Sequence, residues 1–382
     1  MIREKEGLTK RNETIVLAVV VAALVLLPLF YFLPTYQNLA GGKYEKRVLA
    51  FYYTWYGNTT AYFGEVSPTS WAHWPEGGHQ PWNDPMDIGA TNHPTLNQSN
   101  VTLYDSCDPD AMRFHMDMAT YAGIDSFIAT WWGQTARSNY NFIQLLNVTE
   151  MYGYDMEHTV YFETVQERFR DNNTACVAEL YGDLSYIVNN YGNHSKFLKV
   201  FDEDMGIYRP VIFIYSTTAR PSIANWTTVV NYLHGNGSYP FLIADLGGPR
   251  AVPQDMIPLF DGFHIYNPLG VYREEPENAI KKFESLVISS RIHGKLACVT
   301  TIAGYDDSNI GREPPRPILD RNNGGTYNLS WDVACKTQPD WALICSFNEW
   351  HEGSEIEPSL EDGYFYINET KRHTAIFKSW IS

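Results

Sequence analysis

Two glutamates near the C-terminus, Glu349 and Glu352, lie in a segment that combines carboxylates with an amide, an imidazole and an indole. From Trp341 to Pro358 the chain reads W-A-L-I-C-S-F-N-E-W-H-E-G-S-E-I-E-P. The apolar run Trp341 to Phe347 has the length of a buried strand, so the polar residues that follow it are expected where that strand meets solvent. Acids placed there can donate and accept protons.

The spacing of the two acids decides whether they can act together. On a continuing strand, residues three apart point to opposite faces, whereas one turn of helical geometry, which Gly353 permits, brings both acids to one side. Two carboxyls in a poorly solvated cleft repel each other, which raises one pKa and leaves the other group ionised. Such a pair supplies an acid and a base at one pH. The alternative is a solvated acidic loop.

Apolar runs of β type recur along the chain and are separated by amphipathic segments. The eight runs are Val48–Tyr56, Asp125–Trp132, Thr159–Thr164, Val211–Thr217, Pro240–Asp245, Gly262–Asn267, Lys295–Ala303 and Trp341–Phe347. Helical patterns between them include Asp110–Tyr121, Tyr140–Tyr152, Ala175–Asn190, Glu277–His293 and Leu329–Lys336. Alternating strands and helices without a glycine-rich nucleotide motif predict a (β/α)8 TIM barrel.

Barrel enzymes carry their chemistry at the carboxyl ends of the strands, so the residues that end these runs are expected to share one cleft. A sugar needs aromatic faces for its C–H groups and polar side chains for its hydroxyls. We predict Glu349 and Glu352 as catalytic, and as substrate-binding Tyr52, Tyr53, Trp55, Tyr56, His73, Trp74, Trp131, Glu163, Tyr266, Asn348, Trp350 and His351. Other residues near these ends are Trp132, Gln166, Asp245, His264 and Asn267.

The first run is followed by about 50 residues with little regular pattern, Gly57–Cys107. A loop of that length in a compact domain is usually functional, and we predict that it forms the substrate-binding rim. Its histidines, His73, His79 and His93, match no standard metal spacing, and H-E-G-S-E lacks the second histidine of the zincin motif. We therefore expect neither a metal nor a cofactor.

An uncharged apolar run of 19 residues, Ile15–Leu33, is long enough to cross a bilayer as a helix. Basic residues precede it, which predicts a cytoplasmic N-terminus. The expected organisation is a tail at 1–14, a signal anchor at 15–33, a linker at 34–45 and an extracytoplasmic barrel at 46–382, at the cell surface or in a secretory lumen. A cleaved signal peptide is the alternative.

Other patterns bear on the compartment and on partners. Ten N-x-S/T glycosylation signals follow the apolar run, at Asn58, Asn97, Asn100, Asn147, Asn172, Asn193, Asn225, Asn236, Asn328 and Asn368. Five cysteines leave at least one thiol unpaired and allow one or two disulfides. The net charge of -16 argues against nucleic acid as a partner. A neutral oligosaccharide or polysaccharide substrate agrees with that charge.

Several motifs resemble glycoside hydrolase family 99, the endo-α-mannosidase group. They are F-Y-Y-T-W-Y-G-N at Phe51–Asn58, D-I-G-A at Asp87–Ala90, Y-D-S-C-D-P-D-A-M-R-F-H-M at Tyr104–Met116 and, most specific, S-F-N-E-W-H-E-G-S-E-I-E at Ser346–Glu357. Three positions depart from the family pattern: Thr54 replaces a proline, E-T-V-Q-E-R-F at Glu163–Phe169 replaces E-P-Y-x-G-R, and T-W-W-G at Thr130–Gly133 replaces S-W-Y.

The resemblance implies a barrel fold and endo-cleavage of α-mannosidic linkages with retention, through a 1,2-anhydro sugar. It implies that Glu349 draws the proton from the sugar's 2-hydroxyl, that Glu352 is the general acid and then the base for water, and that Glu163 contacts the sugar. Two other classes stay open at this point: a related barrel of cell-surface polysaccharide assembly that transfers sugars, and a non-catalytic glycan-binding surface protein.

Overall fold

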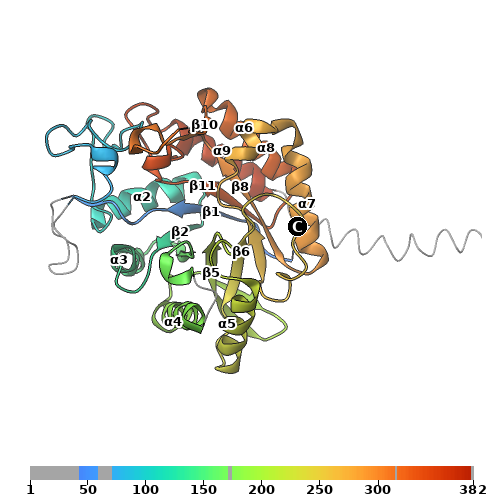
Figure 1. Ribbon diagram of the computed structural model, residues 1–382. Helices are drawn as coiled ribbons and strands as arrows, with labels where there is room; N and C mark the ends of the chain where they lie inside the picture. The colour runs from blue at the N-terminus through green and yellow to red at the C-terminus, as the bar shows by residue number, and fades with distance from the viewer. Residues whose placement is uncertain (1–42, 59–70, 171–173, 315, 380–382) are drawn as a thin grey trace, which may run out of the picture. The chain divides into compact units, whose positions relative to one another are not determined.

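Eight parallel strands close into a barrel in the part of the chain that the computed structural model describes, residues 43–58, 71–170, 174–314 and 316–379 (Figure 1). In order around the barrel they are β1 (Arg47–Tyr52), β2 (Ser126–Trp131), β3 (Glu157–Glu163), β5 (Ile207–Tyr215), β6 (Phe241–Asp245), β7 (Gly262–His264), β8 (Leu296–Ile302) and β11 (Trp341–Cys345). The parallel pairing of β11 with β1 closes the ring. The predicted TIM barrel is confirmed.

The barrel strands are largely apolar and buried because helices cover their outer faces and side chains fill the barrel interior. In β1, Val48 to Phe51 are all inaccessible to solvent. Phe51 points inward, where its ring lies 4.7 Å from that of Tyr161 and 5.8 Å from that of His264. Each predicted apolar run overlaps one barrel strand, but β1 ends at Tyr52 and β11 at Cys345, so the residues that follow belong to loops.

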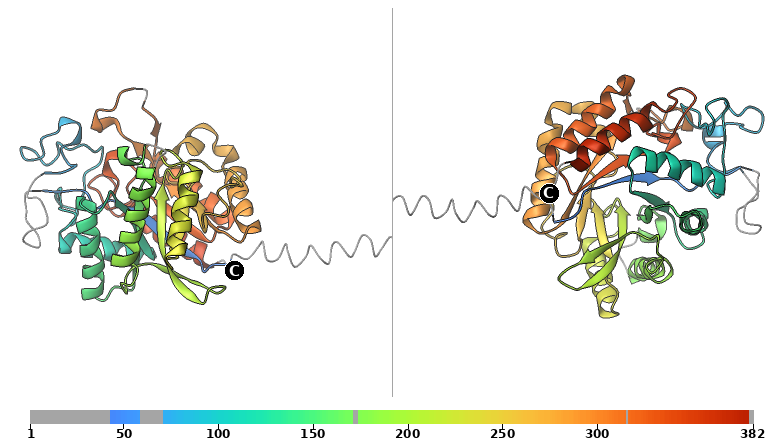
Figure 2. Two further views of the ribbon diagram at one scale, coloured as in Figure 1. Left: turned by 60° about the horizontal axis from the view of Figure 1, so that its bottom comes forward. Right: turned by 180° about the vertical axis from the view of Figure 1, so that it is seen from behind.

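Helices surround the barrel, as Figures 1 and 2 show. They are α2 (Pro109–Ala122), α3 (Arg137–Met151), α4 (Thr174–Tyr191), α5 (Ile223–Gly235), α6 (Leu269–Glu274), α7 (Ala279–Ile292), α8 (Gly325–Thr337) and α9 (Phe365–Ser379). The limits of α2 follow from its sequence: Asp108 caps the first turn by accepting a hydrogen bond from Asp110 N, and Gly123 ends the helix at φ 77°. All five helical patterns quoted above coincide with helices.

Three short strands among the described residues lie outside the barrel. Strand β4 (Lys199–Asp202) pairs antiparallel with the start of β5, and β9 (Tyr305–Asp306) pairs with β10 (Ile318–Leu319) after β8. The segment between β1 and α2 forms the predicted long loop, and its described part contains one short 3-10 turn, Glu76–Gly78. All five cysteines are free thiols, so neither of the disulfides that the sequence allows is formed.

The predicted tail, the signal anchor at 15–33 and most of the linker lie outside the described residues. Within residues 43–379, as far as they are described, no helix is long and apolar enough to span a bilayer.

One amide side chain joins the strand ends where the barrel closes. Asn348 Oδ1 accepts a hydrogen bond from Tyr53 N at 2.7 Å, and its Nδ2 donates to Tyr53 O at 3.1 Å. Phe347 N adds a bond to Phe51 O at 2.8 Å. Asn348 is fully buried, so it replaces the strand pairing that β1 and β11 lose beyond their last residues.

We expect Asn348→Ala to lower the free energy of unfolding by roughly 2–4 kcal/mol, because it leaves two buried backbone groups of Tyr53 without partners. Urea unfolding of both proteins measures the change. The matched control is Asn231→Ala on the exposed face of α5, expected within about 0.5 kcal/mol of wild type. Equal stability of the Asn348 variant would contradict the closing role of the amide.

Candidate active site

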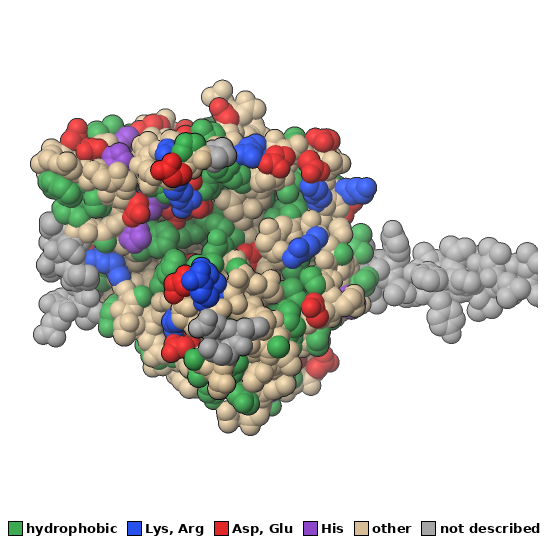
Figure 3. All heavy atoms as spheres, in the orientation of Figure 1, with side chains coloured by type: hydrophobic (Ala, Val, Ile, Leu, Met, Phe, Trp, Pro, Cys, Tyr) green, Lys and Arg blue, Asp and Glu red, His purple; other side chains and the backbone are tan. Residues whose placement is uncertain are grey.

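A cavity of about 220 Å³ opens at the carboxyl ends of the barrel strands. Figure 3 shows it as a hollow lined by apolar side chains, with acidic and histidine side chains at its edge. The residues that line it are Tyr53, Trp55, Trp132, Tyr161, Glu163, Val165, Tyr215, Tyr266, Arg312, Glu349, His351 and Glu352. They come from the ends of β1, β2, β3, β5, β7 and β11 and from the loop between β9 and β10.

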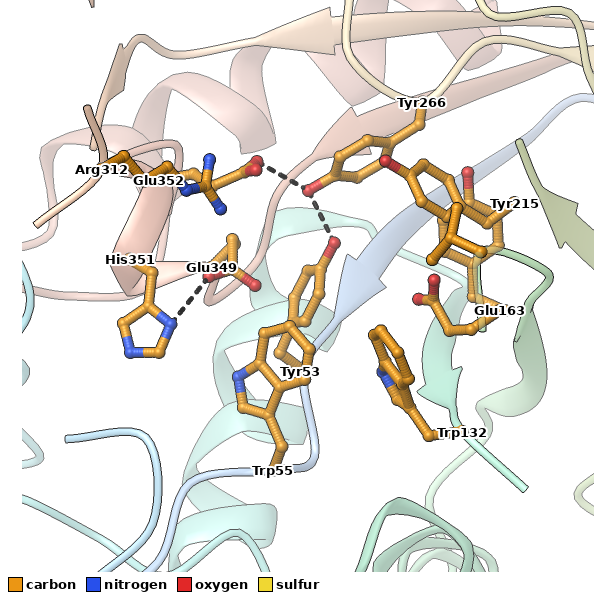
Figure 4. A pocket seen from close by; sticks show the side chains of 12 residues that line it. Tyr53, Trp55, Trp132, Glu163, Tyr215, Tyr266, Arg312, Glu349, His351 and Glu352 are labelled. Atoms are coloured by element: carbon orange, nitrogen blue, oxygen red, sulfur yellow. Dashed lines mark hydrogen bonds and ion pairs between the residues drawn. The ribbon is translucent and has the colours of Figure 1, made fainter. Parts of the chain in front are cut away.

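The segment after β11 folds back on itself and brings both predicted catalytic acids to this cavity. Ser346 Oγ accepts a hydrogen bond from Glu349 N at 2.8 Å, and a 3-10 turn, Trp350–Glu352, follows. Gly353 ends the turn at φ 57°, and a Cβ there would lie 2.9 Å from the carbonyl oxygen of Asp306. The turn therefore requires glycine, and it places Glu349 and Glu352 on one side, as their spacing predicted (Figure 4).

The two acids differ in their hydrogen bonds. Glu352 accepts from the hydroxyl of Tyr266 at 3.1 Å and from that of Tyr305 at 3.4 Å. Glu349 is buried, and its Oε2 has no hydrogen-bond partner among the described residues. Its Oε1 lies 3.7 Å from Nδ1 of His351.

The environment raises the pKa of both carboxyls. For Glu349 the causes are burial first and then the charge of Glu352, and they hold its pKa well above the usual range. Burial also raises the pKa of Glu352, but the Arg312 guanidinium and the Tyr266 hydroxyl oppose that rise. The pKa of Glu349 is therefore raised more strongly than that of Glu352, so the environment of the free site favours a proton on Glu349 over one on Glu352.

Glu163, the last residue of β3, is a third acid in the cavity. It is buried, and burial raises its pKa to about 8. The Thr130 hydroxyl donates a hydrogen bond to its Oε1 at 2.9 Å, and the Trp132 indole donates to the same hydroxyl at 3.0 Å. Glu163 and Trp132 are thus fixed relative to each other on the wall formed by β2 and β3.

His351 is neutral at physiological pH, because burial lowers its pKa to about 4. Its Nε2 donates to the carbonyl oxygen of His73 at 2.9 Å, which leaves Nδ1 as the unprotonated nitrogen on the side of Glu349. The ring of His73 stacks on Trp55 at 4.5 Å with an angle of 8° between their planes. This contact holds the Trp55 indole against the cavity.

Seven of the residues predicted to bind substrate lie behind the cavity rather than in it. Tyr52, Tyr56, Trp74, Trp131, Asn348 and Trp350 are buried, and His73 backs Trp55. For these side chains the expected place in the cleft is corrected, because the chain leaves the strand after Tyr52 and alternates across β2. The Trp131 indole donates to Asn139 at 2.9 Å, and the next residue, Trp132, faces the cavity.

Sequence reasoning left out four lining residues: Tyr161, Val165, Tyr215 and Arg312. Tyr215 ends β5, so the rule that strand ends face the cleft could have found it. Arg312 lies in the loop between β9 and β10, where no periodic pattern marks it. Its Nη1 contacts Asp307 at 2.9 Å and the Tyr305 hydroxyl at 3.2 Å.

Known proteins resemble this chain over most of its length. It is 27% identical over 336 residues to the glycoprotein endo-alpha-1,2-mannosidase of Rattus norvegicus, covering 82% of this chain and 68% of that protein. A glycoprotein endo-alpha-1,2-mannosidase-like protein of Homo sapiens is 25% identical over 332 residues, covering 81% and 68%. The solved structure of the GH99 endo-alpha-mannosidase from Bacteroides thetaiotaomicron shares the fold with a TM-score of 0.68 at 23% identity, covering 87% and 98%.

The family model described as Glycosyl hydrolase family 99 matches residues 43–371, which include all the barrel strands and every residue that lines the cavity. The motif resemblance noted from the sequence is thereby confirmed. The chain belongs to glycosyl hydrolase family 99 and is a glycoside hydrolase.

Proposed function

We propose that this protein is a retaining endo-glycosidase that cleaves α-mannosidic linkages in glycans. The observation that carries the proposal is the placement of Glu349 and Glu352 on one tight turn, facing one cavity together with Glu163 and stacking aromatic rings. The relatives named as endo-alpha-1,2-mannosidases support the choice of linkage. Sugar transfer in polysaccharide assembly and binding without cleavage are the competing functions, and no feature of the cavity favours either.

In the proposed first step, the Glu349 carboxylate removes the proton of the sugar's 2-hydroxyl, and O2 forms a bond to C1. The bond from C1 to the leaving oxygen breaks, and Glu352 gives that oxygen a proton. In the second step, Glu352 takes a proton from water, and the water oxygen attacks C1. The C1–O2 bond then breaks, and Glu349 returns the proton to O2. Two inversions at C1 give net retention.

The roles require the proton on Glu352 and the charge on Glu349 when substrate is bound, which reverses the preference of the free site. Glu349 Oε2 is a buried acceptor without a partner in the described part of the chain. A sugar hydroxyl that donates to this atom would stabilise the ionised form of Glu349 and so favour the proton on Glu352. Substrate binding would in this way set the protonation that the first step needs.

We further propose that residues 15–33 anchor the protein in a membrane, with the barrel outside the cytoplasm. The apolar run and the basic residues before it support this arrangement.

We expect Glu349→Gln and Glu352→Gln each to lower the rate of endo-cleavage by about 10²–10⁴-fold, because each removes one proton-transfer group. The purified full chain is incubated with α-mannan and high-mannose glycans, and released oligosaccharides are measured by mass spectrometry. Glu284→Gln, an exposed acid on α7, is the control and should match wild type. Folded wild type that releases no oligosaccharide would favour transfer or binding.

We expect a bell-shaped dependence of the rate on pH, because the active form carries one proton on the pair formed by Glu349 and Glu352. We expect Tyr266→Phe to move the alkaline limb to higher pH, since it removes a hydroxyl that lowers the pKa of Glu352. Profiles of kcat against pH, which report the substrate complex in which Glu352 carries the proton, measure the shift, with Tyr272→Phe, which changes a buried hydroxyl outside the cavity, as control. An unchanged alkaline limb would show that Glu352 does not supply the proton.

Glu163 should make stability depend on pH. Its folded pKa of about 8 exceeds the usual value, so the folded state binds the proton more tightly and stability falls as pH rises from about 4.5 to 8. We expect Glu163→Gln to flatten this fall and to be the more stable protein above pH 8, by an amount on the order of a few kcal/mol. Chemical unfolding across this range tests it, with exposed Glu167→Gln as control. Parallel curves for wild type and Glu163→Gln would contradict it.

A further inference from the structure

Asparagines of this chain occur in glycosylation signals far more often than their number explains. Of the 25 asparagines after residue 33, ten are followed two positions later by serine or threonine. Serine and threonine together make up 48 of the 382 residues, about one in eight, which would give about three such signals. The excess indicates that the signals serve as acceptors for N-linked glycans.

The structure sorts the signals by exposure. Among the signals in which the structure describes both the asparagine and the serine or threonine, six have an exposed asparagine. These are Asn97, Asn100, Asn147, Asn193, Asn236 and Asn368. They lie in the long loop after β1, on α3, after α4, after α5 and on α9. None of the six lines the catalytic cavity. Glycans on them would leave that cavity open.

Asn225 is the opposite case. It is 6% exposed in the first turn of α5, where its backbone N–H donates to the capping hydroxyl of Ser222. Its Nδ2 is buried without a partner among the described residues, so there is no room for a sugar on this nitrogen. A chain modified at Asn225 could not pack this turn, and the folded protein therefore carries no glycan there.

We propose that the folded protein carries N-linked glycans at the six exposed asparagines and none at Asn225. In each modification, the Nδ2 nitrogen forms a bond to the anomeric carbon of a glycosyl phosphate donor. The bond from that carbon to the phosphate oxygen breaks, the phosphate leaves with the electron pair, and one amide proton is released. A separate transferase of the cell catalyses the step.

The two of these six signals that lie within helices, at Asn147 and Asn368, fix the order of glycosylation and folding. The hydroxyl two residues after the asparagine is part of the signal, so the transferase has to reach it. Thr149 and Thr370 are fully buried, and their hydroxyls bond to Leu145 O and Tyr366 O within their helices. Asn147 and Asn368 are therefore modified before α3 and α9 form.

The test is production of the full chain in cells that N-glycosylate exported proteins, followed by mass spectrometry of the glycopeptides. An aliquot of each preparation is heated, and only preparations that unfold cooperatively are analysed as folded protein. We expect glycan mass at all six exposed asparagines and an unmodified Asn225. A glycan on Asn225 in the folded protein, or unmodified Asn97, Asn100, Asn193 and Asn236, would overturn the proposal. Empty Asn147 and Asn368 beside four occupied sites would also overturn the six-site set.

Substitutions at one signal separate glycan loss from other effects. Ser195→Ala removes the signal of Asn193 while keeping the asparagine, and Ser195→Thr keeps the signal. We expect the glycopeptide of Asn193 to lose its glycan in the first variant and to keep it in the second. Asn190→Gln, an exposed asparagine of α4 outside any signal, should leave the glycan mass of the whole protein unchanged. Identical glycopeptides from both Ser195 variants would show that the mass at Asn193 has another origin.

Discussion

The burial of three carboxyl groups in one cavity is the constraint on which this site depends. Water no longer solvates Glu163, Glu349 and Glu352 fully, so their charges have to be met by hydrogen-bond donors or remain protonated. The described wall supplies donors to two of them, the Thr130 hydroxyl for Glu163 and the Tyr266 hydroxyl for Glu352. No residue that the structure describes donates to Glu349 Oε2. Under the proposed mechanism a sugar hydroxyl completes the set, and the position of the proton then depends on bound substrate.

Beneath the cavity, a buried polar network holds the turn that carries the acids. Glu357 accepts hydrogen bonds from the Tyr104 hydroxyl at 2.8 Å, from the Trp350 indole at 3.1 Å and from His115 at 3.0 Å. The Tyr104 hydroxyl also accepts from Asn348 at 3.2 Å. Because every member is buried and bonded, the network can fix the direction of the Glu349 and Glu352 side chains. Several aromatic residues expected to contact sugar have this supporting place instead.

The barrel and its catalytic end could be predicted from the sequence because apolar runs of strand length are a local signal, and so is the E-W-H-E spacing that forms a turn before Gly353. The direction of side chains just beyond a strand could not be predicted from the sequence, because the alternation of the strand ends there and the conformation of the loop determines it. Trp131, in contrast, is the last residue of β2 and points away from the cavity by the alternation of that strand, and the next residue, Trp132, faces the cavity. Arg312 reaches the site from an irregular loop, whose position depends on contacts such as that with Asp307 and not on any pattern in its own sequence.

The three segments that depart from the family pattern lie outside the turn that carries Glu349 and Glu352. Thr54, in place of the usual proline, is fully buried and does not line the cavity. Trp132 and Val165, from the two other departing segments, do line it, on the wall formed by β2 and β3. The paired acids stand on the turn after β11 instead. Under the proposed mechanism, changes on the wall formed by β2 and β3 alter the surface that a sugar meets without moving Glu349 and Glu352, so substrate range can vary while the reaction stays the same.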